Sequence, residues 1–276
     1  MKTGIRYRCL RYIQGNFIRK KFFCLVFASL AFLLTVLAQQ KIFTPSNAHA
    51  HNDYIHPIPF YTAYNAGFGS IEVDIFPVNG ILCVAHSKNE IQPQLTLKSL
   101  YLDPLSDELK ANNSRRIKLL VDIKENYELS LKFLLQEIEP LKTYLSTPKE
   151  SKPLTILISG MRPAPAEYKN YPGYIFFDDD LKLPHKASEW ERVGQVSLPF
   201  TKFSTWKGEN SIEAKDKKLL THIIDSVHLA GKTIRFWAAP DYEASWIMQM
   251  KLGVDLIGTD KIDELANFLR RRSEKK

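Results

Sequence analysis

Short apolar runs alternate with helical patterns from residue 46 onward, and this alternation restricts the fold more than any other feature of the chain. It is typical of βαβ units around a parallel sheet. We expect eight strands, at residues 47–51, 70–76 (with 81–86 as an extension or hairpin), 117–124, 154–160, 173–178, 195–200, 233–239 and 255–259. Helical patterns lie between them, among others at 59–66, 126–145, 211–230, 242–252 and 264–272. Eight such repeats predict an α/β fold of the (β/α)8 TIM-barrel type, as one domain over residues 46–272.

The active site of a TIM barrel lies at the carboxyl ends of its strands, and charged residues recur there in this sequence. Glu72 and Asp74 stand two residues apart on one predicted strand, so both side chains point to the same face and can reach one cation. His51 precedes this pair at the end of the first strand, and His86 follows it. A metal site flanked by two proton carriers is an arrangement suited to phosphodiester hydrolysis.

The third predicted strand adds a further acid and a base to this end of the barrel. Asp122 and Lys124 alternate with apolar residues in Leu119-Leu-Val-Asp-Ile-Lys124, so they share a face. Barrel interiors accept such charges when they are paired or bind an ion. We expect Asp122 to be a third metal ligand and Lys124 to contact a phosphate oxygen, with a structural ion pair as the alternative. Three carboxylates favour one divalent cation, Mg²⁺ or Ca²⁺, over Zn²⁺.

The charge of the chain is concentrated at its beginning. The formal net charge is +8, but seven bases lie before residue 22, and without them 31 basic residues face 30 acidic ones. A near-neutral body argues against a nucleic-acid partner. Residues 1–21 therefore form a basic N-terminal segment, and residues 22–38 follow as an uncharged apolar run.

That apolar run predicts a signal anchor or a cleaved signal peptide. The expected location is at a membrane, with the catalytic domain lumenal or extracellular, or secreted. A mitochondrial presequence should be amphipathic rather than uniformly apolar, so it fits less well. No protein partner is predicted.

The order His51, Glu72-x-Asp74, His86, Asp122-x-Lys124, with Trp237 late in the chain, resembles the phospholipase-C-like phosphodiesterase superfamily. Its spacing is similar to glycerophosphodiester phosphodiesterases and to phospholipases of the sphingomyelinase D type. Three runs, at residues 51–54, 99–105 and 253–260, resemble a branch that includes the fungal altered inheritance of mitochondria protein 6. Two features depart from the glycerophosphodiester pattern: Asn52 follows His51 where that pattern has Arg, and the third acid is Asp rather than Glu.

The resemblance implies a TIM-barrel phosphoric diester hydrolase in which two histidines act as general base and general acid beside a divalent cation. By this analogy His51 is the base or nucleophilic helper and His86 the acid, although the two roles can be exchanged. The substrate would be a phospholipid or a glycerophosphodiester, attacked by water or by its own neighbouring hydroxyl. Trp237 either packs over the substrate or fills the barrel. Arg162, which follows the fourth strand, is a candidate to clamp phosphate.

Two other functions remain open. His49-x-His51 at the end of a first strand also begins metal hydrolases that use paired histidines, but His185, His222 and His228 are poorly placed to complete such a site. His49 and Asn52 are then expected to contact the metal ligands or His51 without binding the metal or the substrate themselves. The other alternative is a catalytically silent barrel that binds a phosphorylated ligand or a protein.

Overall fold

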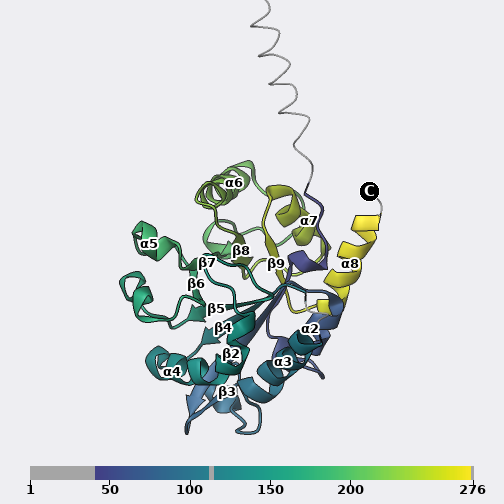
Figure 1. Cartoon of the computed structure of the whole chain (residues 1–276). Coiled ribbons are helices and arrows are strands. Elements are labelled where there is room, and N and C mark those ends of the chain that lie inside the picture. Colours follow the sequence, from purple (N-terminus) through teal and green to yellow (C-terminus); the bar gives the residue numbers. More distant parts are fainter. Residues whose placement is uncertain (1–40, 112–114, 275–276) are drawn as a thin grey trace, which may run out of the picture. The chain divides into compact units, whose positions relative to one another are not determined.

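The computed structural model describes residues 41–111 and 115–274, which cover the predicted barrel except for residues 112–114 (Figure 1). The basic segment at 1–21 and the signal anchor or signal peptide at 22–38 lie outside the described residues. The unit that begins at Phe43 is described here.

The strands of this unit form one sheet that closes on itself. They are β1 (Ala48–Ala50), β2 (Ser70–Val78), β3 (Ile81–Val84), β4 (Ile117–Ile123), β5 (Leu154–Gly160), β6 (Ile175–Asp179), β7 (Val193–Pro199), β8 (Ile234–Trp237) and β9 (Leu256–Thr259). Their order is β1-β9-β8-β7-β6-β5-β4-β2-β3, and a parallel pairing of β1 with β2 completes the circle. Only β3 is antiparallel, and it forms a hairpin with β2. Eight parallel strands therefore make a closed barrel, which confirms the predicted TIM-barrel fold.

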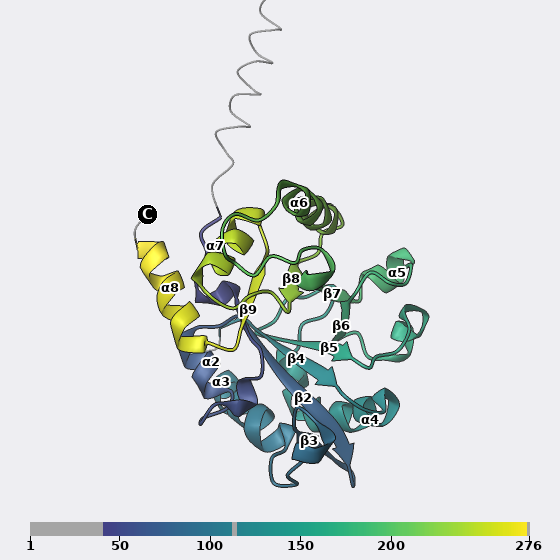
Figure 2. The same cartoon turned by 180° about the vertical axis from the view of Figure 1, so that it is seen from behind.

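Helices surround these strands (Figures 1 and 2). They are α2 (Tyr61–Ala66), α3 (Asp103–Lys110), α4 (Tyr127–Ile138), α5 (Ala187–Trp190), α6 (Ala214–Leu229), α7 (Glu243–Leu252) and α8 (Ile262–Glu274). The predicted helix at 126–145 is shorter than expected, because it becomes a 3₁₀ helix at Glu139–Tyr144. Pro140 lacks an amide hydrogen and its ring obstructs the preceding turn, so the α-helix ends there.

Apolar side chains form two separate cores. The larger core lies between the strands and the helices and includes Val73, Val121 and Ile158. The smaller one consists of Leu120, Leu157 and Phe176. These three alternate with the residues of the larger core along β4, β5 and β6, so they lie inside the barrel. Buried polar side chains, among them Glu72, Gln195 and Arg235, alternate with residues of the larger core on other strands.

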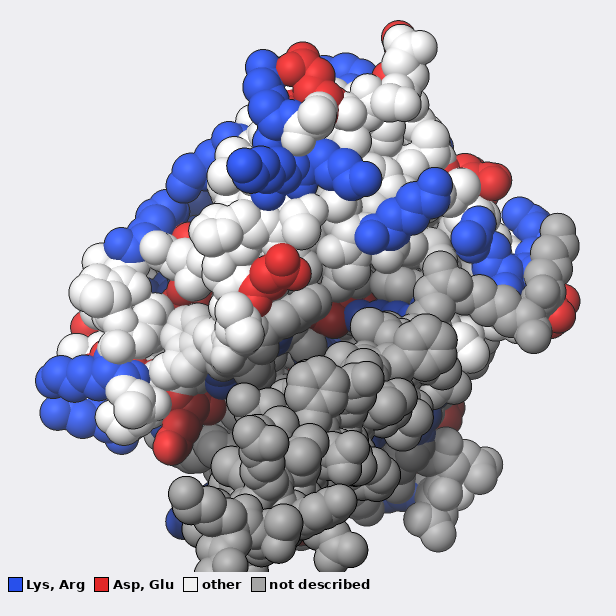
Figure 3. All heavy atoms as spheres, turned by 90° about the horizontal axis from the view of Figure 1, so that it is seen from above, with Lys and Arg blue, Asp and Glu red and all other residues white. Residues whose placement is uncertain are grey.

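Basic and acidic side chains are mixed on the surface. On the face shown in Figure 3, lysine and arginine side chains occupy separate places and acidic side chains lie between some of them. This distribution agrees with the near-neutral composition of the chain after residue 21. Within residues 41–111 and 115–274, no helix has the length and apolar character needed to cross a membrane.

Candidate active site

Three carboxylates meet at the carboxyl end of the barrel. Glu72 and Asp74 come from β2 and Asp122 from β4, and the parallel register places Asp74 directly opposite Asp122. One oxygen from each of the three lies within 4.8 Å of the others. Strand alternation brings Glu72 and Asp74 to the same face, and pairing of β2 with β4 adds the third oxygen.

The donor atoms of this cluster fit a divalent cation. Oδ1 of Asp122 is buried and has no hydrogen-bond partner, although buried polar atoms are usually satisfied. Burial raises the pKa of Asp122, even though Lys124 opposes the shift. An unsatisfied carboxylate oxygen beside two other carboxylates is what a hard cation with oxygen ligands would complete.

Glu72 is held from inside the barrel by two further residues. Its Oε2 lies 2.9 Å from Nη1 of Arg235, on β8, and 2.7 Å from Nε2 of His49, on β1. Burial alone would raise the pKa of Glu72, but the Arg235 guanidinium and the His49 contact outweigh it and hold that pKa well below its usual range. Glu72 is therefore an anion with a fixed position.

His49 supports the cluster rather than offering a free metal ligand. Its Nδ1 lies 2.8 Å from Oγ of Ser70, so both ring nitrogens have partners. Burial, followed by the charge of Arg235, lowers the pKa of His49 to about 4, and the ring is neutral at pH 7. Because both ring nitrogens of His49 are engaged, His49 gives no support to the paired-histidine metal site.

His51 lies just after β1 and contacts the end of β9. Its Nδ1 is 2.7 Å from Oδ1 of Asp260, and Nδ2 of Asn52 is 3.0 Å from the same nitrogen. Burial works against protonation, but the hydrogen bond to Asp260 and the charge of Glu72 outweigh it and raise the pKa of His51. A carboxylate at Nδ1 favours the proton on that nitrogen, which leaves Nε2 for the substrate.

His86 contacts the carboxylate cluster and is open to solvent. Its side chain is 61% exposed, and its Nδ1 lies 3.3 Å from Oδ2 of Asp74. The Tyr54 hydroxyl lies 2.8 Å from that oxygen, 3.3 Å from Nδ1 of His86 and 2.8 Å from Oδ1 of Asn52. β1 and β3 pair with the same edge of β2, β1 at its start and β3 at its end, so both histidines lie near the carboxylates at this end of the barrel.

Lys124 neutralises part of this negative charge. Its Nζ lies 2.6 Å from Oδ2 of Asp122 and 2.9 Å from Oδ2 of Asp74. Burial would lower the pKa of Lys124, but these two carboxylates outweigh it and raise it. The lysine is therefore a fixed cation beside the cluster, in the ion pair expected as the alternative to phosphate contact.

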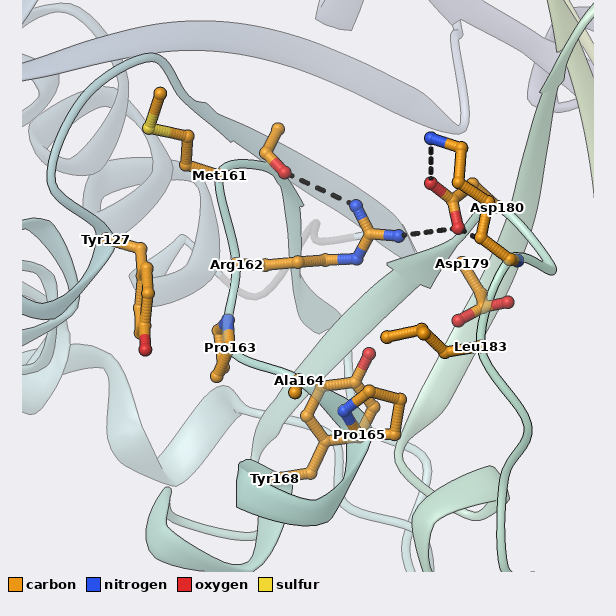
Figure 4. Close-up of a pocket in the computed structure, with 12 residues that line it drawn as sticks. Tyr127, Met161, Arg162, Pro163, Ala164, Pro165, Tyr168, Asp179, Asp180 and Leu183 are labelled. Atoms are coloured by element: carbon orange, nitrogen blue, oxygen red, sulfur yellow. Dashed lines mark hydrogen bonds and ion pairs between the residues drawn. The ribbon is translucent and has the colours of Figure 1, made fainter.

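Two pockets are lined by other candidate residues of the sequence. One, of about 240 Å³, is lined by His51, Trp237, Asp241 and Asp260. Trp237 ends β8 and is 48% exposed, so it lies at the barrel mouth instead of filling the barrel. Arg162 lines a different pocket, of about 510 Å³, where it is 3.3 Å from Oδ1 of Asp180 (Figure 4).

Sequence reasoning missed two residues of this site. Arg235 is an isolated base in an apolar strand, two residues before Trp237. Strand alternation puts it on the same face as Trp237, and this could have identified it from the sequence. Tyr54 follows His51 in a loop without periodicity, and its contacts with Asp74 and His86 depend on the tertiary structure.

Comparison with known proteins finds a related domain family and related proteins. The model of the AIM6-like phosphodiesterase domain matches residues 38–118, a range that holds His51, Glu72, Asp74 and His86. An altered inheritance of mitochondria protein 6 homolog from Arthroderma benhamiae is 25% identical over 81% of this chain and 84% of its own length. The Saccharomyces cerevisiae protein of that name (strain S288c) is 24% identical over 80% of this chain and 70% of its own.

A solved structure supports the fold. A glycerophosphodiester phosphodiesterase from Parabacteroides distasonis superimposes with a TM-score of 0.56 at 14% identity, over 84% of this chain and all of its own. At that identity the likeness concerns the fold alone. Taken together, the matches confirm the resemblance of this chain to the phospholipase-C-like phosphodiesterases and, among them, to the branch of altered inheritance of mitochondria protein 6.

Proposed function

We propose that this protein is a metal-dependent phosphoric diester hydrolase that acts on a phospholipid or a glycerophosphodiester-type substrate. The observation that carries this proposal is a cluster of three carboxylates, with oxygens within 4.8 Å of one another, that has two histidines beside it. His86 contacts Asp74 directly, and the charge of Glu72 acts on His51. The match to a phosphodiesterase domain supports the reaction class.

Glu72, Asp74 and Asp122 would hold the cation, for which oxygen ligands favour Mg²⁺ or Ca²⁺. When bound, such an ion neutralises charge on the phosphate and stabilises the transition state by several kcal/mol. Arg235 and His49 fix Glu72 for this task, and the unpartnered Oδ1 of Asp122 is free for it.

The two histidines would transfer protons on opposite sides of the phosphate. In its neutral form, His51 has its proton directed to Asp260, so Nε2 can accept a proton from the attacking oxygen. His86 would then protonate the leaving oxygen, or the two would exchange roles. Lys124 would contact a phosphate oxygen. The arrangement serves attack by water and attack by a hydroxyl of the substrate equally well.

The N-terminal apolar segment at 22–38 would hold the enzyme at a membrane or direct its secretion. The barrel would then lie on the lumenal or extracellular side. This assignment follows from the sequence alone and is separate from the proposed reaction.

The test is hydrolysis of a phosphodiester panel by the full-length chain. The panel holds glycerophosphodiesters, lysophospholipids, sphingomyelin, phosphoinositides and bis-p-nitrophenyl phosphate, each with Mg²⁺, with Ca²⁺ or with a chelator. We expect turnover that needs a divalent cation and that falls about 10²- to 10⁴-fold in His51→Ala and in His86→Ala.

The matched control is His222→Ala, which removes an exposed histidine of α6 and should retain full activity. Activity that survives both active-site substitutions would refute the two-histidine site. Binding of the cation without turnover of any diester would favour a silent barrel that binds a phosphorylated ligand.

A further inference from the structure

The largest of the pockets described here opens between two loops at the carboxyl end of the barrel. The loop after β5 supplies residues from Gly160 to Tyr168, the loop after β6 supplies residues from Asp179 to Leu183, and Tyr127 adds its ring from the start of α4. Its volume of about 510 Å³ lies within the range of roughly 300–1,000 Å³ that is usual for ligand sites. The proposed reaction uses none of these residues, and the sequence marked only Arg162 among them, as a candidate to clamp phosphate.

The walls of this pocket are mostly apolar. Its apolar side chains are Met161, Pro163, Ala164, Pro165 and Leu183, and the rings of Tyr127 and Tyr168 line it as well. Met161 is 53% exposed and Leu183 54% exposed, although burial of a large apolar side chain is favourable. Exposed apolar side chains around a concave site indicate an apolar ligand.

The charges of the pocket are placed at one side of it. Arg162 reaches across toward Asp180, and its Nη1 donates to the carbonyl of Gly160 at 3.3 Å (Figure 4). The other oxygen of Asp180 lies 2.7 Å from Nζ of Lys182. Asp179 is also engaged, by the Leu181 amide at 2.7 Å and by His185 at 2.9 Å. Two cations therefore meet Asp180, and Arg162 is the one that also contacts Gly160.

This pocket adjoins the carboxylate cluster. Gly160 lines the pocket, and a Cβ atom placed on it would overlap Oδ1 of Asp122. The pocket and the carboxylate cluster therefore meet at Gly160, which is part of the pocket wall and packs against the Asp122 carboxylate.

We propose that this pocket holds the acyl chain of a lipid phosphodiester, with Arg162 beside the phosphate or the ester group from which the chain departs. The inference rests on the proposed hydrolase function and narrows its substrate to a phosphodiester that carries an apolar chain. A glycerophosphodiester without an acyl chain would leave Met161 and Leu183 exposed to water, and contact with these side chains would add nothing to its binding.

The test uses substrates with one head group and increasing chain length. Glycerophosphocholine and its 1-butanoyl, 1-hexanoyl and 1-octanoyl esters are compared at concentrations where all are monomeric, with the full-length protein. Both kcat/KM and the dissociation constant by calorimetry are measured. We expect kcat/KM to rise about two- to fourfold for each added methylene until the pocket is filled.

Variants separate this pocket from general effects of charge. Leu183→Asp should abolish most of the increase with chain length, and Leu183→Met should retain it. The control is Leu229→Asp, at the end of α6, where the side chain is 89% exposed and lies outside the pocket. It should leave the dependence on chain length unchanged.

The two proposals can fail separately. Equal kcat/KM for all four substrates would refute the acyl-chain pocket and leave the hydrolase proposal intact. The same conclusion would follow if Leu183→Asp lowered kcat/KM by the same factor for each substrate. The opposite result is also distinguishable. A dissociation constant that falls with chain length, and no longer does so in Leu183→Asp, would retain the pocket, while absence of turnover of these substrates and of every diester of the panel above would refute the hydrolase. A dissociation constant independent of chain length would refute the pocket in either case.

Discussion

Nδ1 of His51 lies 2.7 Å from Oδ1 of Asp260, so the end of β9 sets the orientation and the proton of a histidine that follows β1. The two residues are far apart in the sequence and become neighbours because β1 pairs with β9 when the barrel closes. In the proposed mechanism His51 transfers a proton through Nε2, and Asp260 acts on it only through Nδ1. Asp260 is thus a positioning residue.

Asp260→Asn should lower kcat/KM by about 100-fold and lower the pKa of His51, because the hydrogen bond and charge that raise it are removed. If His51 is the base, the acidic limb of the pH profile moves to lower pH; if it is the acid, the alkaline limb does so. The limb that moves therefore assigns the role. Asp263→Asn, an exposed acid in the first turn of α8, is the control. An unchanged profile with nearly full activity would contradict the role of Asp260.

Gly160→Ala should weaken binding of the cation by tenfold or more, because the new Cβ would displace Oδ1 of Asp122. The backbone of Gly160 has φ +67°, so alanine also strains it by about 1 kcal/mol. Gly231→Ala separates these effects, since Gly231 has φ +70° and no atom within 4 Å of its Cβ position. Calorimetric titration with Mg²⁺ and with Ca²⁺ measures the affinity. Equal affinity in both variants would show that Asp122 does not bind the ion.

Arg235→Met should destabilise the fold by about 3–5 kcal/mol, because it leaves Glu72 buried without its guanidinium partner. Adding Glu72→Gln should restore much of that loss, since the uncompensated charge is then gone, but it should not restore cation binding. Lys142→Met is the control, because its pair with Glu139 is exposed and contributes about 0–1 kcal/mol. Urea unfolding gives the free energies. A loss below 1 kcal/mol for Arg235→Met would mean that Glu72 is stabilised by other groups.

Asp178→Asn should stabilise the fold at pH 7.5 by about 1–3 kcal/mol. Burial raises the pKa of Asp178 to about 6, against roughly 3.9 in the unfolded chain. Between these values the folded state binds more protons, so stability falls as the pH rises from about 4 to about 6. The advantage of the amide should therefore vanish near pH 4. Thermal unfolding at both pH values, with Asp225→Asn of α6 as an exposed control, checks it. A gain of equal size at pH 4 would point to packing instead.

Local patterns in the sequence were sufficient for the elements of the barrel. The alternation of β-branched runs with helical patterns placed each strand within about two residues, because strand and helix periods depend on neighbouring side chains. Glu72 and Asp74 could be placed on one face for the same reason. Asp122 and Lys124 could be assigned to the same barrel end, because parallel strands all end there.

Contacts between distant strands were decided only by the tertiary structure. The pairing of His51 with Asp260, the bond from Arg235 to Glu72 and the bridge that Tyr54 makes to Asp74 and His86 join residues on different elements. No periodicity specifies such contacts, because they depend on barrel closure and on loop paths. The sequence by itself thus determined the fold and the residue types available at the barrel mouth. The closed barrel decided which carboxylate meets which cation, since that requires the register and the distance between strands.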